Sequence, residues 1–216
     1  MAQTKTGNAS IIKDRGSRLR EFLFRYRGKV PIPLLVMTFL WLLFRPVPAE
    51  AEGGDWTLLF GVAVTLIGEG IRIWSVGYAG ASTRGKKASA RRLVTAGPYS
   101  YVRNPIYIGN FLVSLGVVLT IRSWFFTLLF VLYFVVVYSL IVRHEESFLA
   151  SEFGDAYRSY TKSVYRFWPK WAPYARAEGE FRWKELRKEY WTLLGFSLGF
   201  VLVALSGRFS VWLRGL

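Results

Sequence analysis

Five blocks of apolar residues alternate with charged segments along the chain, and this pattern predicts helices in a membrane. The blocks cover residues 30–44, 56–81, 106–121, 124–142 and 190–205. A helix needs roughly 20 apolar residues to cross a hydrocarbon core of about 30 Å. The second and fourth blocks meet this requirement, whereas the other three need flanking aromatic residues or local thinning of the bilayer. We therefore predict an all-α, multi-pass transmembrane bundle of about five helices.

The ends of the blocks carry the residues expected at membrane interfaces and turns. Tryptophan, an interfacial anchor, lies near block ends at positions 41, 56, 124 and 191. Only Arg122 and Ser123 separate the third and fourth blocks, which predicts a tight helical hairpin. The first block comes late and lacks a small-residue cleavage site, so we expect no cleaved signal peptide.

The distribution of charge predicts how the bundle is oriented. The chain is 52 % hydrophobic, with a mean hydropathy of +0.26 and a formal net charge of +15. Basic residues crowd residues 1–29 and the loop after the second block, while the next connections carry few, so the excess marks cytoplasmic loops rather than a nucleic-acid surface. We expect a cytoplasmic N-terminus, an external C-terminus and contact with anionic headgroups, although a direct role at a substrate is the alternative. The predicted parts are a basic tail at 1–29, a single transmembrane domain at 30–206 and a short tail at 207–216.

The residue types exclude several kinds of chemistry. The chain has no cysteine, which excludes disulfides, thiol nucleophiles and cysteine-bound zinc or iron–sulfur centres. It has one histidine, His144, so we predict no metal site.

Two polar clusters are unusual for a membrane bundle. The pair Asn104-Pro105 predicts the start of the third helix, because Asn is a strong N-cap and Pro is favoured at the first helical position. With Arg103 beside it, this helix start suits a carboxylate or phosphate, or is simply a capped helix with Arg103 reaching to headgroups. The second cluster, Arg143-His144-Glu145-Glu146, follows the fourth block. It is either functional or a solvated helical turn paired with Arg143 and Arg158, in a helix that continues to Phe153 with Gly154 as C-cap.

Two further groups have both a structural and a functional interpretation. Aromatic residues after Gly154 form either an interfacial anchor or a wall for a planar or cationic ligand: Tyr157, Tyr160, Tyr165, Phe167 and Trp168. Glu69 and Arg72 lie three residues apart inside the second block, and we expect them to neutralise each other as an ion pair.

These motifs, in this order, resemble the isoprenylcysteine carboxyl methyltransferase family, which is related to the phospholipid N-methyltransferases. The resemblance covers residues 93–169 and rests on three motifs: Gly97-Pro98-Tyr99-x-Tyr101-Val102-Arg103-Asn104-Pro105-x-Tyr107-x-Gly109, then Glu145-Glu146-x-x-Leu149-x-x-x-Phe153-Gly154-x-x-Tyr157-x-x-Tyr160, then Val164-x-Arg166-Phe167-x-Pro169. It implies an S-adenosylmethionine-dependent membrane methyltransferase with a cytoplasmic cofactor pocket. The implied cofactor residues are Tyr99, Arg103, Asn104, Pro105 and Tyr107 on one side and Glu145, Glu146, Tyr157 and Tyr160 on the other.

Within this pattern Arg103 and Glu146 are the residues expected to matter most for activity, with Glu145 as the competitor. The resemblance therefore requires the start of the third helix to meet the far end of the fourth. Carboxyl methyltransferases usually have His where this chain has Asn104, and Asn is more similar to the phospholipid branch. The Gly-x-Gly element of that branch fits either Gly68-Glu69-Gly70 or the region of Gly77 and Gly80.

The methyl acceptor stays open between an isoprenylcysteine carboxylate, a phospholipid amine and a small hydrophobic thiol or amine. An amine has to lose a proton, which Glu146, Glu145 or His144 could accept. Two other functions are compatible with the residues: an NADPH-dependent sterol-type reductase, and a lipid-binding or scaffold protein without activity. We expect a lipid or lipidated partner and no nucleic acid.

Overall fold

All regular structure in the described part of the chain is helical. The computed structural model describes residues 16–27, 29, 33, 36, 40, 56–80, 92–188, 190, 194 and 195. A helix covers residues 16–25, and the later elements are α3 (Trp56–Ala79), η2 (Gly97–Ser100), α4 (Pro105–Leu119), α5 (Trp124–Ser163) and η3 (Trp183–Lys188). The predicted all-α fold is confirmed. Most of the first and last apolar blocks lies outside the described residues, so the count of five helices stays a prediction.

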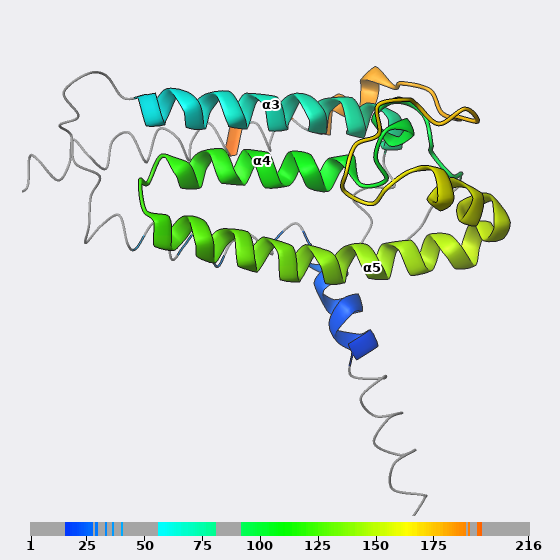
Figure 1. The fold of residues 1–216 in the computed structure, drawn as a ribbon, viewed down its shortest axis with the longest axis horizontal. Helices are drawn as coiled ribbons and strands as arrows, with labels where there is room; N and C mark the ends of the chain where they lie inside the picture. Colours follow the sequence, from blue (N-terminus) through cyan, green and yellow to red (C-terminus); the bar gives the residue numbers. More distant parts are fainter. Residues whose placement is uncertain are drawn as a thin grey trace, which may run out of the picture.

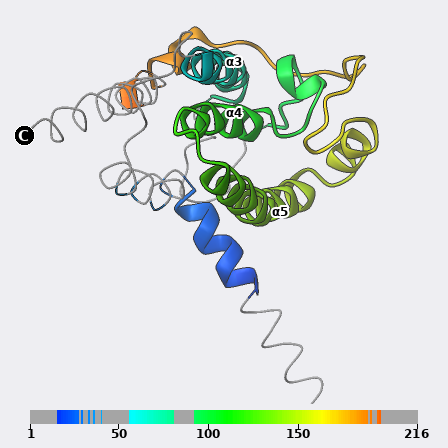
Figure 2. The same cartoon turned by 60° about the vertical axis from the view of Figure 1, so that its left-hand side comes forward.

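The three long helices lie side by side, with α4 between α3 and α5 (Figures 1 and 2). Helices α3 and α5 are long and apolar enough to cross a membrane, and α4 is a shorter apolar helix of 15 residues. At 1.5 Å per residue, α4 is about 22 Å long, less than the thickness of a hydrocarbon core. The sequence had already indicated that this block is short.

Glycines bring α3 and α4 unusually close together. A Cβ at Gly61 would lie 2.6 Å from the carbonyl oxygen of Gly116, and one at Gly68 would lie 2.9 Å from that of Gly109. The glycines on each helix are seven residues apart, or two turns, so both pairs lie on the facing surfaces. Small residues let helix backbones approach in this way where lipid offers no hydrophobic drive for association. Gly68 therefore serves helix packing, while a Cβ at Gly70 would meet nothing within 4 Å.

Aromatic residues fill the space between α4 and α5. Phe111 of α4 packs edge-on against Phe134 of α5, with ring centroids 5.0 Å apart, and Phe134 stacks on Tyr138 at 3.8 Å. The two helices are joined by a short turn in which Arg122 has a φ of 57°. The predicted tight hairpin is confirmed.

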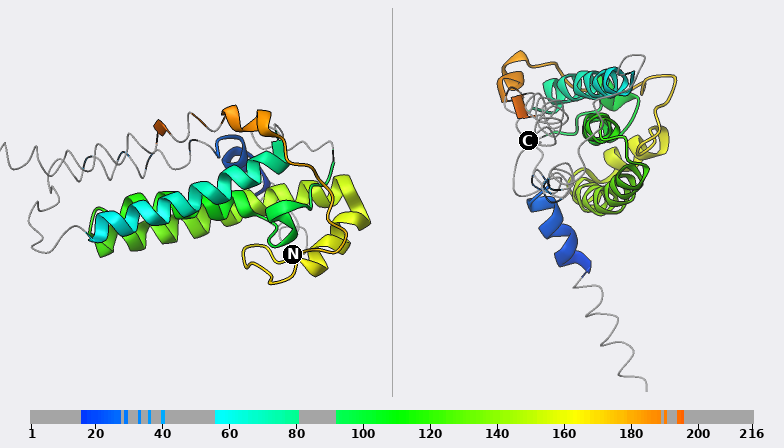
Figure 3. Two further views of the ribbon diagram at one scale, coloured as in Figure 1. Left: turned by 90° about the horizontal axis from the view of Figure 1, so that it is seen from above. Right: turned by 90° about the vertical axis from the view of Figure 1, so that its left-hand side faces the viewer.

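The segment 164–178 crosses the end of the bundle as extended and turning chain. It runs beside the residues that precede α4 (Figures 1 and 3). Backbone hydrogen bonds of 2.9 Å join the two segments, from the N–H of Arg103 to the carbonyl of Tyr165, Lys170 to Tyr101, Tyr174 to Ser100 and Thr95 to Glu178. These bonds fix the loop that carries Arg103 against residues 62 to 83 positions later in the chain.

Candidate functional site

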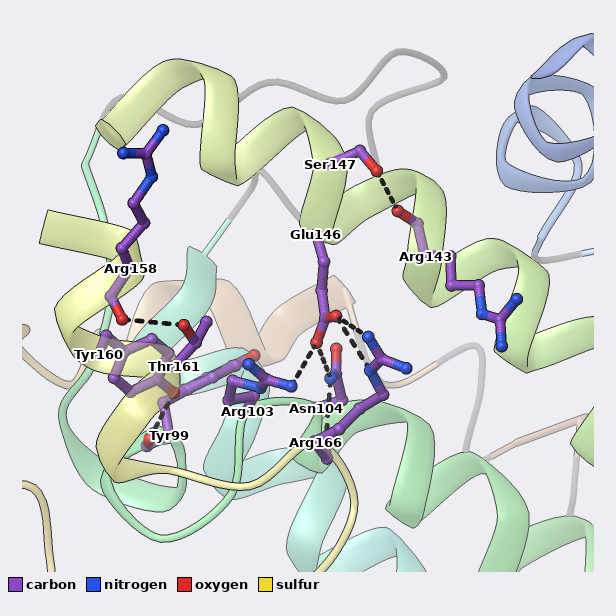
Figure 4. A network of polar contacts seen from close by, with 10 residues as sticks. All are labelled: Tyr99, Arg103, Asn104, Arg143, Glu146, Ser147, Arg158, Tyr160, Thr161 and Arg166. Carbon is purple, nitrogen blue, oxygen red and sulfur yellow. Dashed lines mark hydrogen bonds and ion pairs between the residues drawn. The ribbon is translucent and has the colours of Figure 1, made fainter. Parts of the chain in front are cut away.

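A carboxylate at the end of the bundle holds two guanidinium groups. Glu146 projects from α5 and is buried, with 9 % of its surface exposed. Its Oε1 lies 3.3 Å from Nη2 of Arg103, and its Oε2 accepts hydrogen bonds from Nε and Nη2 of Arg166 at 2.9 and 2.5 Å (Figure 4). The side chains of Arg103 and Glu146 are 14 % and 11 % exposed, so water screens their attraction little. The convergence that the resemblance required is present.

Asn104 stands where the N-cap of α4 was predicted, but its side chain does not cap the helix. Its amide instead donates to Oε1 of Glu146 and to the carbonyl of Arg166, both at 3.2 Å. A hydrogen bond to a buried carboxylate is charge-assisted and stronger than one to a neutral group, which explains why this partner prevails. Pro105 occupies the first helical position as predicted and is fully buried.

Glu145 faces a different partner. Its Oε2 accepts a hydrogen bond of 2.8 Å from the hydroxyl of Tyr107 in α4. Glu145 lies beyond Val142, where the apolar part of α5 ends. Burial raises the pKa of the Glu145 carboxyl, while the Tyr107 hydroxyl and the charge of Arg27 oppose that rise. The adjacent carboxylates thus differ: Glu146 is fixed by two cations, and Glu145 is held by one neutral donor.

The interpretation of this cluster as a solvated turn is wrong for Glu146. Arg143 is exposed, and its side chain points away from Glu146 in Figure 4. Arg158 pairs with Asp155 at 3.3 Å on the exposed surface. Glu146 is covered because the chain changes direction at Gly154. The φ of 49° and ψ of −120° at this glycine interrupt α5, so that the residues after it turn back toward the site. As predicted, the helix continues to Phe153 and Gly154 has a positive φ, but α5 does not end there, because helical turns resume after Gly154 and reach Ser163.

The aromatic residues after Gly154 divide into two groups. Tyr157 and Tyr160 are buried, and the hydroxyl of Tyr160 donates to the carbonyl of Tyr99 at 2.6 Å. Tyr165, Phe167 and Trp168 are exposed. An aromatic wall is therefore restricted to Tyr157 and Tyr160, together with Tyr174, whose ring centroid lies 5.4 Å from that of Tyr160.

Three residues at this end of the bundle were not predicted from the sequence to belong to the site: Arg166, Phe24 and Arg27. Arg166 belongs to a motif that the resemblance quoted, so a signal was available. Phe24 and Arg27 gave no signal beyond their place in a basic tail. The Phe24 ring is buried with its centroid 5.2 Å from that of His144, and Arg27 lies over the Phe24 ring at 4.0 Å.

The charged pair inside α3 forms as predicted. Nε of Arg72 lies 3.4 Å from Oε2 of Glu69. Arg72 also reaches across to α4, where its Nη1 donates to Oδ1 of Asn110. Pairing and a polar partner on the neighbouring helix explain how two charges are accommodated in an apolar block.

The donors and acceptors at the end of the bundle suit a small molecule that carries both a positive and a negative charge. Nε of Arg103 is buried without a hydrogen-bond partner among the described residues, so it can donate to a carboxylate. Glu145 and Glu146 provide negative charge, and the rings of Tyr157 and Tyr160 are faces on which a cation or a planar base packs well. The combination fits S-adenosylmethionine, which contains an amino acid, a sulfonium and an adenine. Among the described residues, no group of three or more His, Cys, Asp or Glu side chains could hold a metal ion.

The fold and site define a helical membrane protein with a charged site at one end of its bundle. Residues 56–156, which include Arg103 and Glu146, match the family model described as phospholipid methyltransferase. The chain is 38 % identical over 102 residues to a protein-S-isoprenylcysteine O-methyltransferase of Schizosaccharomyces pombe, covering 45 % of this chain and 43 % of that protein. It is 30 % identical over 124 residues to the protein of the same name from Xenopus laevis, covering 50 % and 39 %. Over its central part the chain is therefore similar to phospholipid and isoprenylcysteine methyltransferases.

A third relative has a different name. The cobalt-zinc-cadmium resistance protein CzcN of Cupriavidus metallidurans is 33 % identical over 125 residues, covering 58 % of this chain and 52 % of that protein. The matches therefore span about half or less of the length of these relatives. No solved structure matches the chain.

Proposed function

We propose that this protein is an S-adenosylmethionine-dependent membrane methyltransferase that acts on a lipid or a lipidated molecule. The main support for this proposal is the contact between Arg103 and Glu146. These residues come from two motifs about forty positions apart, and an ion pair joins them at one end of the bundle. The match to the phospholipid methyltransferase model supports the reaction class, and relatives named for methylation of isoprenylcysteine support a lipid-like acceptor.

The cofactor supplies a methyl group already activated on a sulfonium sulfur. Arg103, through its free Nε, would bind a carboxylate, and Glu146 would hold Arg103 in place. Asn104 also donates to Oε1 of Glu146, and Arg166 binds the other carboxylate oxygen, Oε2. The remaining proposed cofactor residues surround this group: Tyr99, Pro105, Tyr107, Glu145, Tyr157 and Tyr160. Their contribution is orientation and exclusion of water, the main needs of an in-line displacement from an activated donor.

Glu145 is the proposed proton acceptor for an amine substrate. Its raised pKa brings it closer to the operating pH than an ordinary carboxyl, which is the condition for a useful general base. Glu146 is less suited, because two guanidinium groups already compete for its lone pairs. A carboxylate acceptor needs no base, so with that acceptor Glu145 would serve only to hold the cofactor.

We infer that the site faces the cytoplasm and that the bundle crosses the membrane several times. Arg158 and Arg166 follow the apolar part of α5 in the sequence, and Arg103, which precedes α4, pairs with Glu146 at the same end of the bundle. An excess of basic residues is typical of cytoplasmic loops. A hydrophobic acceptor would reach the site from the bilayer, between helices, while the cofactor would enter from water.

The test supplies purified protein with methyl-labelled S-adenosylmethionine and a membrane lipid extract, and identifies the labelled species by mass spectrometry. We expect label in a lipid or lipidated molecule. At saturating cofactor, Glu145→Gln should abolish label in an amine product but leave label in a carboxylate product, while Glu152→Gln, an exposed acid on the same helix, should leave both unchanged. Binding of NADPH in place of S-adenosylmethionine would make the protein a reductase. Binding of neither cofactor would leave a scaffold.

A further inference from the structure

The helix at residues 16–25 is attached to the bundle by one face and leaves a second apolar face uncovered. Phe24 is 3 % exposed and belongs to the core formed by Tyr107, Tyr138 and Ile141, with Leu23 packed beside it. The helix is therefore anchored at the site end of the bundle.

The uncovered face is apolar and aromatic. Leu19, Phe22 and Tyr26 are 51 %, 58 % and 41 % exposed. Their spacing of three and four residues aligns them along one side of a helix. The rings of Phe22 and Tyr26 lie 4.8 Å apart and form one continuous surface.

Basic residues border this face. Arg18 and Arg25 are exposed and, at 100° per residue, project next to Phe22. Residues 16–29 contain five basic side chains and one acid, Glu21, which lies farther round the helix. An apolar stripe flanked by arginines is typical of a helix in the headgroup region of a membrane.

The direction and level of the helix agree with that location. It runs across the long axis of α3, α4 and α5 rather than along it (Figures 1 and 3). Phe24 contacts His144, two residues after Val142, where the apolar part of α5 ends. If the bundle axis follows the membrane normal, the helix lies in the plane of the bilayer at the boundary between acyl chains and water.

We propose that residues 16–26 form a docking surface for an anionic bilayer, in which Leu19, Phe22 and Tyr26 enter the lipid and Arg18 and Arg25 bind acidic headgroups. The surface is continuous with the site through Phe24. The Phe24 ring contacts both Arg27 and His144, and His144 directly precedes Glu145. Binding to acidic lipid would thus hold Arg27 near the Tyr107–Glu145 pair. The proposal relies on the membrane placement given above, but not on methyl transfer.

The absence of cysteine makes a direct measurement possible, since any introduced cysteine is unique. Full-length Phe22→Cys and Ser17→Cys proteins, with Ser17 on the other side of the helix, are labelled with an environment-sensitive fluorophore. They are reconstituted in phosphatidylcholine alone or mixed with phosphatidylglycerol. Quencher attached to lipid chains then reports whether each probe enters the bilayer.

We expect several-fold stronger lipid quenching at position 22 than at position 17 in the anionic bilayer, and a clear decrease without phosphatidylglycerol or in high salt. Leu19→Cys should behave as Phe22→Cys does. Arg18→Gln combined with Arg25→Gln should remove the dependence on acidic lipid. Equal quenching at positions 17 and 22 would overturn the proposal. So would a probe at position 22 that is shielded from both lipid and aqueous quenchers, which would indicate a protein partner or a second copy. A protein without methyl transfer that still shows the expected quenching would refute the proposed function and leave the docking surface intact.

Discussion

Two ion pairs of equal length provide a direct test of how burial controls their energy. Arg103–Glu146 and Arg158–Asp155 both have a nitrogen–oxygen distance of 3.3 Å. The first pair is 14 % and 11 % exposed, and the second is 74 % and 96 % exposed. Glu146→Gln and Asp155→Asn each remove one negative charge while preserving the shape of the side chain.

The structure predicts very different costs for the two substitutions. Two unit charges 3.3 Å apart attract by about 5 kcal/mol at an effective dielectric constant of 20 and by about 1 kcal/mol in water. Breaking a buried pair by removing one partner costs roughly 3–5 kcal/mol, because the other charge is left buried. Arg166 is 39 % exposed and stays solvated, so we expect the lower end, about 3 kcal/mol, for Glu146→Gln. The exposed pair should contribute nothing measurable.

Thermal unfolding in a mild detergent, followed by tryptophan fluorescence, measures both variants. A loss of about 3 kcal/mol corresponds to a decrease in Tm of roughly 6–12 °C for a domain of this size. Glu146→Gln should also abolish methyl transfer below its unfolding temperature, while Asp155→Asn keeps full activity. Equal Tm values for the two variants would refute the argument from burial, and near-normal turnover of Glu146→Gln would remove Glu146 from the mechanism.

Three more substitutions, one of them with a matched control variant, test individual features of the structure. Tyr107→Phe removes the donor to the Glu145 carboxylate. Since that bond favours the charged form, the pKa of Glu145 should rise further, and the acid limb of the pH–rate profile for an amine acceptor should move to higher pH. Gly116→Ala places a Cβ against the Gly61 carbonyl oxygen and should cost about 1–3 kcal/mol in unfolding assays. Its control, Gly70→Ala, meets nothing within 4 Å and should be neutral or stabilising by up to about 1 kcal/mol. Gly154→Ala should cost about 1–3 kcal/mol and weaken cofactor binding, measured by calorimetry, because it strains a φ of 49°.

Each of these three predictions would be contradicted by a specific result. An unchanged acid limb in Tyr107→Phe would mean that Glu145 does not titrate in the rate-determining form. Equal stability of the two glycine variants would show that α3 and α4 separate without cost. A Gly154→Ala protein with normal affinity would show that the bend does not position Tyr157 and Tyr160.

The sequence predicted the helices and the meeting of their motifs, but not the partners within the site. The lengths of the apolar blocks predicted most of the ends of α3, α4 and α5 to within a few residues, because lipid-facing helices are defined by local composition. The interruption at Gly154 could also be predicted from local sequence, because a positive φ at a helix C-cap depends mainly on one residue type, glycine. Asn104 was assigned a capping bond that it does not make, because its competing partner, Glu146, is 42 residues away. The contact of Phe24 with His144 is tertiary as well, and no local pattern encodes it.

The backbone bonds between segment 164–178 and the loop before α4 have a consequence for biosynthesis. A chain emerging from the ribosome can complete α3, α4 and most of α5 before Tyr165 has been made. Arg103 would then lack its backbone partner, and Glu146 would lack Arg166. Insertion of the described helices and completion of the charged centre are therefore separate events in time, and a truncation before residue 164 would yield membrane-inserted helices without a finished centre.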